Sequence, residues 1–186
     1  MKEKLILASK SPRRKQILTL ADIEFEIIAE DTPESYPEDL AINQIPIHIA
    51  LQKALQIKKD YPDRKILAAD TIVVLGDEII GKPKDKADAM MLLGKLSGQT
   101  HQVITGVVIL QGDEVQSFAD LTTVTFNTLT PAQIEYYVDQ CKPYDKAGAY
   151  GAQDWIGMVA IKKINGSYFT VMGMPMHLVY AHLNDF

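Results

Sequence analysis

The sequence predicts an α/β protein in which a mixed β-sheet is flanked by helices. Strand-like apolar runs and helix-like stretches with i, i+3, i+4 periodicity are interspersed along the chain, which is typical of sheets covered by helices. Hairpin signals in the second half, at Gly112-Asp113 and Asn165-Gly166, add antiparallel pairs to the sheet. No linker, repeat or charge block divides the 186 residues, so we expect one domain over residues 1–186.

Local signals place the elements of the first half. Ser11 is a suitable N-cap and Pro12 suits the first helical position, so a helix starts there. Gly76-Asp77 signals a tight turn between two strands. The expected elements are a strand at 5–9, a helix at 12–20, a strand at 24–28, a helix at 45–59, a buried strand at 65–75 and its antiparallel partner at 78–81.

Capping residues and turns place the second half in the same way. Asp85 caps one helix, and Thr130 with Gln133 forms a capping box for another. The expected elements are a helix at 86–96, a hairpin of strands 100–110 and 115–126, a helix at 131–141, a second hairpin of strands 158–164 and 167–172, and a last helix after Pro175.

Composition narrows the class of protein. Apolar residues make up 47% and charged residues 23%, which excludes a disordered or fibrous chain. The net charge of −5 disfavours stable nucleic-acid binding. A single cysteine, Cys141, excludes an internal disulfide and suits a reducing compartment. No run approaches a membrane span, and Met-Lys-Glu-Lys does not begin a signal peptide, so we expect a cytoplasmic protein without a membrane partner.

The buried strand at 65–75 contains one carboxylate, Asp70. An ionised carboxylate in an apolar strand is strongly disfavoured unless a cation, a metal or several donors compensate it. Asp70 is therefore the leading candidate for catalysis. The alternative interpretation is a strand-end aspartate that accepts hydrogen bonds from nearby backbone N–H groups.

Basic residues follow the first strand at a helix start. Arg13 and Arg14 fall in the first turn, where the helix dipole disfavours cations. Together with free backbone N–H groups and the hydroxyls of Ser9 and Ser11, they form a common type of phosphate site. The alternative is a pair of solvated arginines on a surface helix.

Further polar residues complete a set suited to a phosphorylated ligand and a divalent metal. Carboxylates would hold Mg²⁺ or Mn²⁺, and cations would offset the remaining phosphate charge. The glycine-rich segment 145–153 allows a close backbone approach to a ligand, although a structural turn explains it equally well. The remaining polar candidates are Glu30, Asp31, Lys53, Lys82, Asp145 and Lys146.

Six motifs resemble the Maf family of septum-formation-inhibitor-like nucleoside triphosphate pyrophosphatases. They are Leu-Ala-Ser-x-Ser-Pro-Arg-Arg at 7–14, Ala-Asp-Thr-Ile-Val at 69–73, Gly-Lys-Pro at 81–83, Leu-Ser-Gly-x-x-His at 96–101, Asp-Lys-Ala-Gly-Ala-Tyr-Gly-x-Gln at 145–153 and Gly-Ser-Tyr at 166–168. The resemblance implies cleavage of a nucleoside triphosphate into the monophosphate and pyrophosphate, as house-cleaning of nucleotide pools. It also implies a fold similar to that of inosine triphosphate pyrophosphatases (Maf/Ham1), with two lobes around a cleft, and often a homodimer.

The resemblance also assigns roles to individual residues. Asp70 matches the proton acceptor, which also contacts a divalent metal. Glu30 and Asp31 stand where the family usually shows Asp-Glu, which leaves open which of the two reaches the metal. The phosphate-contacting positions correspond to Ser9, Arg14, Lys53 and Lys82, and Arg13 is a further substrate-binding position.

Substrate choice is implied by three positions. Arg13, Thr71 and Gln153 resemble the branch that acts on dTTP and UTP, with modified pyrimidine nucleotides as further substrates. Gln153 can both donate to and accept from a pyrimidine edge. Two alternatives remain: the same reaction on another base, as in CTP or 7-methyl-GTP, and a non-catalytic nucleotide- or DNA-binding regulator of septum formation.

Overall fold

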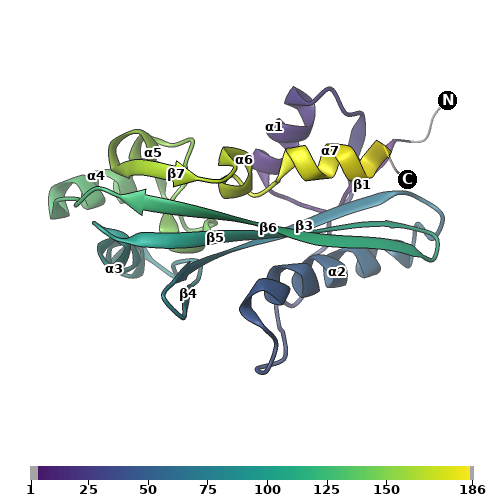
Figure 1. Ribbon diagram of the computed structural model, residues 1–186, viewed down its shortest axis with the longest axis horizontal. Helices are drawn as coiled ribbons and strands as arrows, with labels where there is room; N and C mark the ends of the chain where they lie inside the picture. The colour runs from purple at the N-terminus through teal and green to yellow at the C-terminus, as the bar shows by residue number, and fades with distance from the viewer. Residues whose placement is uncertain (1–3, 185–186) are drawn as a thin grey trace. The chain divides into compact units, whose positions relative to one another are not determined.

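The computed structural model describes residues 4–184. The prediction that Met-Lys-Glu-Lys does not begin a signal peptide concerns residues 1–4, of which residues 1–3 lie outside this range. The elements, labelled in Figure 1, are β1 (Leu5–Leu7), α1 (Pro12–Leu20), β2 (Phe25–Ile27), η1 (Ile42–Gln44), α2 (Ile45–Lys58), β3 (Ile66–Leu75), β4 (Glu78–Ile80), α3 (Lys86–Leu96), β5 (Thr100–Gln111), β6 (Glu114–Phe126), α4 (Pro131–Cys141), η2 (Ala147–Ala149), α5 (Trp155–Ala160), β7 (Ile161–Asn165), α6 (Tyr168–Val171) and α7 (Met176–Asn184).

The strands form one mixed sheet. Its order is β2-β1-β3-β5-β6-β7, and β4 pairs with β3 beside this path. β1 is parallel to both β2 and β3, whereas the pairs β3–β4 and β6–β7 are antiparallel. The predicted mixed sheet with flanking helices is therefore confirmed.

The chain divides into two compact units. Unit 1 comprises Met1–Asp70, Thr105–Asp120 and Gly173–Phe186, and unit 2 comprises Thr71–Ile104 and Leu121–Met172. The boundaries fall within β3, β5 and β6, so each of these long strands contributes residues to both units.

In unit 1, α2 packs against the sheet, and α1 and α7 lie on the other side of it (Figure 1). The core beneath α2 combines Ala50, Ala54 and Ile57 of the helix with apolar residues of β1, β3 and β5. The helix approaches β5 so closely that a Cβ at Gly106 would lie 2.3 Å from the backbone nitrogen of Ile47. Ile45, Ile49, Ala50, Ala54 and Ile57 form the buried stripe of α2, whereas Leu55 is exposed.

In unit 2, helix α3 packs against α4 and against the short η2. Their core includes Leu93 and Leu96 of α3 and the fully buried rings of Phe126 and Tyr137. The two predicted helix starts are confirmed, because Asp85 accepts from the Asp88 backbone N–H and Thr130 closes a capping box with Gln133.

The predicted second hairpin, with strands 158–164 and 167–172, is wrong. The chain is helical through Ala160 in α5, extended only over β7, and helical again in α6. Ile156, Gly157 and Ala160 are buried, a helical i, i+1, i+4 pattern that a short apolar run conceals. β7 pairs instead with β6, where Val124 lies opposite Ile164.

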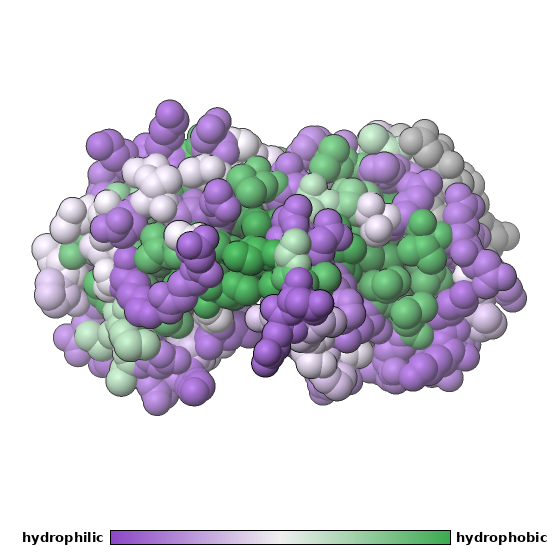
Figure 2. Space-filling model, turned by 60° about the horizontal axis from the view of Figure 1, so that its bottom comes forward, coloured by the Kyte–Doolittle hydropathy of each residue, from purple (hydrophilic) through white to green (hydrophobic). Residues whose placement is uncertain are grey.

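The surface carries both hydrophilic and hydrophobic side chains. Hydrophilic side chains cover much of the face drawn in Figure 2, and hydrophobic ones gather in patches between them. Within residues 4–184, no helix is both long and apolar enough to cross a membrane.

The contact at Gly106 predicts the effect of a single methyl group. Gly106→Ala should lower the free energy of unfolding by about 3 kcal/mol, because the neighbouring atoms are backbone and cannot rotate away. Urea denaturation of the two proteins measures this difference.

Gly94 in α3 is the matched control, since a Cβ there meets nothing within 4 Å. Gly94→Ala should raise the free energy of unfolding by about 0.8 kcal/mol through helix propensity. Similar effects of the two substitutions would contradict the close approach of α2 to β5.

A buried histidine makes the stability of unit 2 depend on pH. His101 is 1% exposed, its Nε2 lies 2.8 Å from the Tyr150 hydroxyl, and its ring packs edge-on against Phe126. Burial lowers the pKa of His101 from 6.5 to about 4. Between these values the unfolded chain binds the proton and the folded chain does not, so folding stability rises with pH.

We expect this contribution to be complete above about pH 6.5 and lost as the pH falls to about 4, a change of about 3 kcal/mol. Denaturation of the wild type and of His101→Gln at several pH values isolates the contribution of His101, because the two proteins have all their other titrating groups in common. A stability difference between the two proteins that stays constant with pH would contradict the prediction.

Candidate active site

Asp70 is the one Asp, Glu, Lys or Arg side chain that is classed as buried within residues 4–184, at 8% exposure. It lies in β3 among residues that are themselves buried. Its Oδ1 accepts a hydrogen bond of 2.7 Å from Nζ of Lys53, whose side chain is 16% exposed. Of the three possible compensations, a cation, a metal or several donors, the structure thus shows a cation.

Lys53 reaches Asp70 from α2. Its neighbours Ile49, Ala50, Ala54 and Ile57 are buried against the sheet. The lysine therefore lies beside the apolar stripe, and its ammonium meets Asp70 in the middle of β3. The lysine side chain is largely withdrawn from solvent.

Glu34 also contacts this ammonium, and sequence reasoning missed it. Its Oε1 accepts from Lys53 Nζ at 3.1 Å. The loop that carries Glu34 is held by other side chains of α2, because Gln52 donates to the Ser35 carbonyl and Gln56 to Glu30. The acidic character of residues 29–40 was the only signal, and it did not distinguish Glu34 from the other acids in the loop.

Two carboxylates therefore converge on one cation at this place. Within residues 4–184, no group of three or more His, Cys, Asp and Glu side chains is placed to hold a metal. Mg²⁺ needs no such group, since one or two carboxylates, waters and substrate phosphates usually complete its shell. Asp70 and Glu34 fit that requirement.

The two acids predicted as metal ligands have other partners. Glu30 accepts from the Gln56 amide at 2.6 Å, and Asp31 pairs with Lys10 at 2.8 Å with its side chain 95% exposed. Their assignment to a metal stays a prediction.

The start of α1 combines a buried hydroxyl with two guanidinium groups. Ser9 is buried, and its Oγ accepts from the Ser11 backbone N–H at 3.3 Å and from Arg14 Nη1 at 3.1 Å. Arg14 Nε also donates to the Gly173 carbonyl at 2.8 Å. Burial lowers the pKa of Arg14, and the nearby charge of Asp70 opposes this effect.

Arg13 differs from Arg14 in one respect. Its Nε is buried and has no hydrogen-bond partner among the described residues. Both arginines are partly buried, which does not fit the alternative of two solvated surface arginines. A donor left unsatisfied beside a helix N-terminus favours an anionic ligand there.

The other predicted site residues belong to unit 2. Thr71 follows Asp70 in β3 and is partly buried, and Lys82 follows β4 and is exposed. The hairpin pairs Val73 with Ile80, so the chain before Lys82 runs beside β3. The assignment of Lys82 as a phosphate contact stays a prediction.

The glycine-rich segment 145–153 is anchored within unit 2. Gly148 donates to the Gly81 carbonyl at 3.0 Å, has a φ of +69°, and would bring a Cβ to 3.1 Å from the side chain of Val73. Lys146 pairs with Asp145 at 2.8 Å. The segment ends at Gln153, which is exposed.

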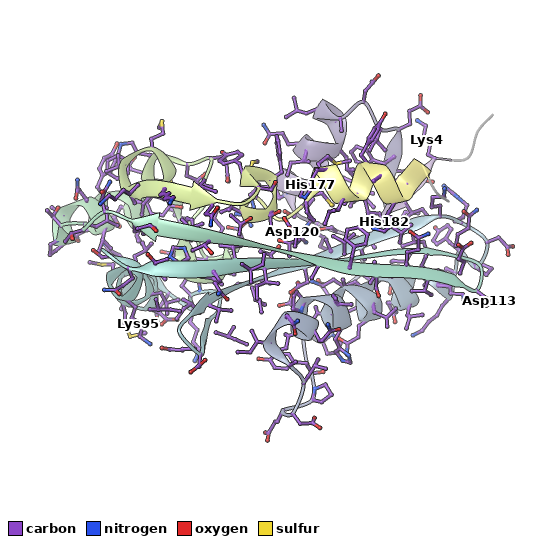
Figure 3. The ribbon with its side chains drawn as sticks, viewed as in Figure 1. Lys4, Lys95, Asp113, Asp120, His177 and His182 are labelled. Atoms are coloured by element: carbon purple, nitrogen blue, oxygen red, sulfur yellow. The ribbon has the colours of Figure 1, made fainter. Side chains whose placement is uncertain are left out.

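The histidines of α7 do not form a metal pair. His182 Nδ1 lies 2.9 Å from Gln116 Oε1 and its ring stacks on Phe118, whereas His177 lies 4.0 Å from Asp120 (Figure 3). They contact different residues of β6, as expected from their spacing of five.

Lys53 permits a direct test of the buried ion pair. Lys53→Met should lower the free energy of unfolding by about 3 kcal/mol, because it leaves Asp70 buried without its partner. Adding Asp70→Asn should recover most of the loss, and urea denaturation of the single and double variants measures both effects.

Lys58→Met on the same helix is the control, because its partner Asp113 is fully exposed and exposed pairs contribute little. Its effect should be far smaller than that of Lys53→Met. Equal effects, or no recovery in the double variant, would show that the pair is not buried as described.

The fold is shared with solved structures of Ham1 proteins. The Staphylococcus aureus Ham1 protein superposes with a TM-score of 0.56 over 98% of this chain and 99% of its own, at 16% identity. A HAM1 protein from Coxiella burnetii gives a TM-score of 0.53 with the same coverage, at 14% identity. These similarities place the chain in the Ham1-like class of α/β folds, as predicted.

Sequence relatives define the family more narrowly. Residues 4–186 match the family described as Maf-like protein. A dTTP/UTP pyrophosphatase of Cytophaga hutchinsonii is 48% identical, covering 92% of this chain and 79% of its own length. One from Phocaeicola vulgatus is 46% identical, covering 98% and 95%, and one from Porphyromonas gingivalis is 44% identical, covering 100% and 95%. The chain belongs to the Maf-like protein family.

Proposed function

We propose that this protein is a nucleoside triphosphate pyrophosphatase that hydrolyses dTTP and UTP to the monophosphate and pyrophosphate. The observation that carries the proposal is the buried carboxylate of Asp70, which lies 2.7 Å from the Lys53 ammonium. Its charge also opposes the lowering of the Arg14 pKa by burial. The names of the relatives, all dTTP/UTP pyrophosphatases, support the choice of substrate.

Asp70 acts as the proton acceptor in this proposal. Water attacks the α-phosphorus, its proton passes to the Asp70 carboxylate, and the bond from the α-phosphorus to the oxygen bridging to the β-phosphate breaks. The electron pair leaves with pyrophosphate. A carboxylate held in place by an ammonium needs little reorganisation to accept that proton, which is the advantage of a preorganised site.

The cations stabilise the phosphates. Arg14 is fixed by Ser9 and the Gly173 carbonyl, so its remaining donors have a defined direction, whereas Arg13 contributes a buried Nε with no protein partner in the described chain. Lys53 and Lys82 keep their predicted roles as phosphate contacts. Charge-assisted hydrogen bonds of this kind are stronger than neutral ones.

We assign Asp70 and Glu34 as the protein ligands of a divalent cation, Mg²⁺ or Mn²⁺, because both carboxylates already contact one cationic centre, Lys53 Nζ. When bound, the ion would offset phosphate charge and lower the pKa of the water. Glu30 and Asp31 are the predicted alternatives to Glu34.

Base selection rests on Arg13, Thr71 and Gln153. A glutamine amide offers both a donor and an acceptor, which matches the N3–H and O4 of uracil and thymine. The exposed position of Gln153 at the end of an anchored segment suits a side chain that meets a ligand.

Release of pyrophosphate from a panel of nucleotides tests this proposal. With Mg²⁺ or Mn²⁺ we expect dTTP and UTP to be turned over faster than CTP, GTP and 7-methyl-GTP, with the nucleoside monophosphate as the second product. Asp70→Asn should reduce turnover at least about 100-fold, because general-base catalysis typically contributes that much, while circular dichroism shows a folded protein.

Asp113→Asn is the control, since that carboxylate is fully exposed in the β5–β6 turn. Release of orthophosphate instead of pyrophosphate, or full activity of Asp70→Asn, would overturn the mechanism. Preference for another base would overturn only the substrate assignment.

A further inference from the structure

A buried tyrosine holds both ends of the turn that carries Gln153. Tyr137 of α4 is 0% exposed, and its hydroxyl donates to Asp154 Oδ2 at 2.8 Å and accepts from the Gly151 backbone N–H at 3.1 Å. The Asp154 backbone N–H donates to the Gly151 carbonyl at 3.0 Å and closes the turn. Gln153 therefore lies inside a four-residue turn whose first and last residues share one phenol.

The side chains of Gln153 and Asp154 also lie against the same backbone atom. An added Cβ at Gly151 would be 2.7 Å from Gln153 Nε2 and 2.6 Å from Asp154 Oδ2. The amide and the carboxylate thus both pack over the Cα of Gly151. Anything that moves the Asp154 carboxylate changes the space open to the Gln153 amide.

The phenol of Tyr137 is the hydrogen-bond donor to the charged carboxylate of Asp154. Lys146 Nζ lies 3.9 Å from Asp154 Oδ2, and the lysine pairs more closely with Asp145, at 2.8 Å. The hydroxyl of Tyr137 is therefore the closest hydrogen-bond donor described for this carboxylate. Burial, reinforced by Asp154, raises the pKa of Tyr137 above its ordinary value, so the hydroxyl keeps its proton.

We propose that Tyr137 is a positioning residue for base recognition: through Gly151 and Asp154 it fixes the turn that presents the Gln153 amide to the pyrimidine. The inference rests on the proposed function, in which Gln153 reads the base. Without the phenol, the Gly151 N–H and the Asp154 carboxylate lose the partner that they share, and the turn on which the Gln153 amide packs is held less tightly. The amide then no longer presents its donor and acceptor to the substrate.

The test compares two substrates on each variant. UTP carries the base, and ribose 5′-triphosphate carries the same phosphates without it. The ratio of their kcat/KM values does not depend on the folded fraction, because both substrates meet the same enzyme preparation. A purely structural role of Tyr137 would therefore leave the ratio unchanged.

We expect Tyr137→Phe to lower the ratio of UTP to ribose 5′-triphosphate about 10-fold, with most of the change in the KM for UTP, and to leave ribose 5′-triphosphate turnover within about twofold. Asp154→Ala removes the acceptor of the Tyr137 hydroxyl and should have the same effect. It replaces Tyr137→Phe in the test if that variant does not fold. Tyr136→Phe is the matched control, because Tyr136 is its exposed neighbour on α4 and should leave the ratio unchanged.

Combination with Gln153→Ala tests whether Tyr137 acts through Gln153. In that background Tyr137→Phe should cause no further loss of the ratio. An unchanged ratio in Tyr137→Phe, or losses that add fully to those of Gln153→Ala, would overturn the inference. A wild type that does not distinguish UTP from ribose 5′-triphosphate would overturn the proposed role of Gln153 in base selection, and this inference with it.

Discussion

The ion pair of Asp70 and Lys53 is the constraint on which the rest of the structure depends. A carboxylate among the apolar residues of β3 needs a cation. Helix α2 supplies one, because its apolar stripe packs on the sheet at Gly106 and leaves Lys53 beside Asp70. The same ammonium also binds Glu34, which lies in the loop between β2 and α2. The packing of α2 thus places the ammonium, which in turn binds Glu34 of the loop and Asp70, the acid proposed to accept the proton.

The two units fix the side chains of the candidate site by different interactions. In unit 1, charge decides: Ser9, Arg14 and the Gly173 carbonyl form a hydrogen-bonded set around a guanidinium near Asp70. In unit 2, close backbone contacts decide. Gly148 lies against Val73, and a Cβ at Gly157 would lie 1.9 Å from the Ala152 carbonyl oxygen. Phosphates need cations with fixed directions, whereas a base edge needs an amide on a rigid turn.

Much of the fold could be predicted because its signals are local. Pro12, the Asp85 cap, the Thr130 capping box and the long apolar run of β3 each specify an element through neighbours within a few residues. The error in the predicted second hairpin has a matching cause. Residues 155–161 form a short apolar run, and only its packing in unit 2 decides that α5 continues to Ala160 before β7 begins.

The sequence by itself determined the class of fold, the buried position of Asp70, the basic start of α1 and, through six motifs, the family. Those conclusions depend on spacing along the chain. Only the tertiary structure decided that Lys53 is the partner of Asp70, that Glu34 joins it, and that Tyr137 holds the turn of Gln153. Each of these contacts joins residues at least 14 apart, and a pairing over such a separation is set by how helices and loops pack, which no local pattern encodes.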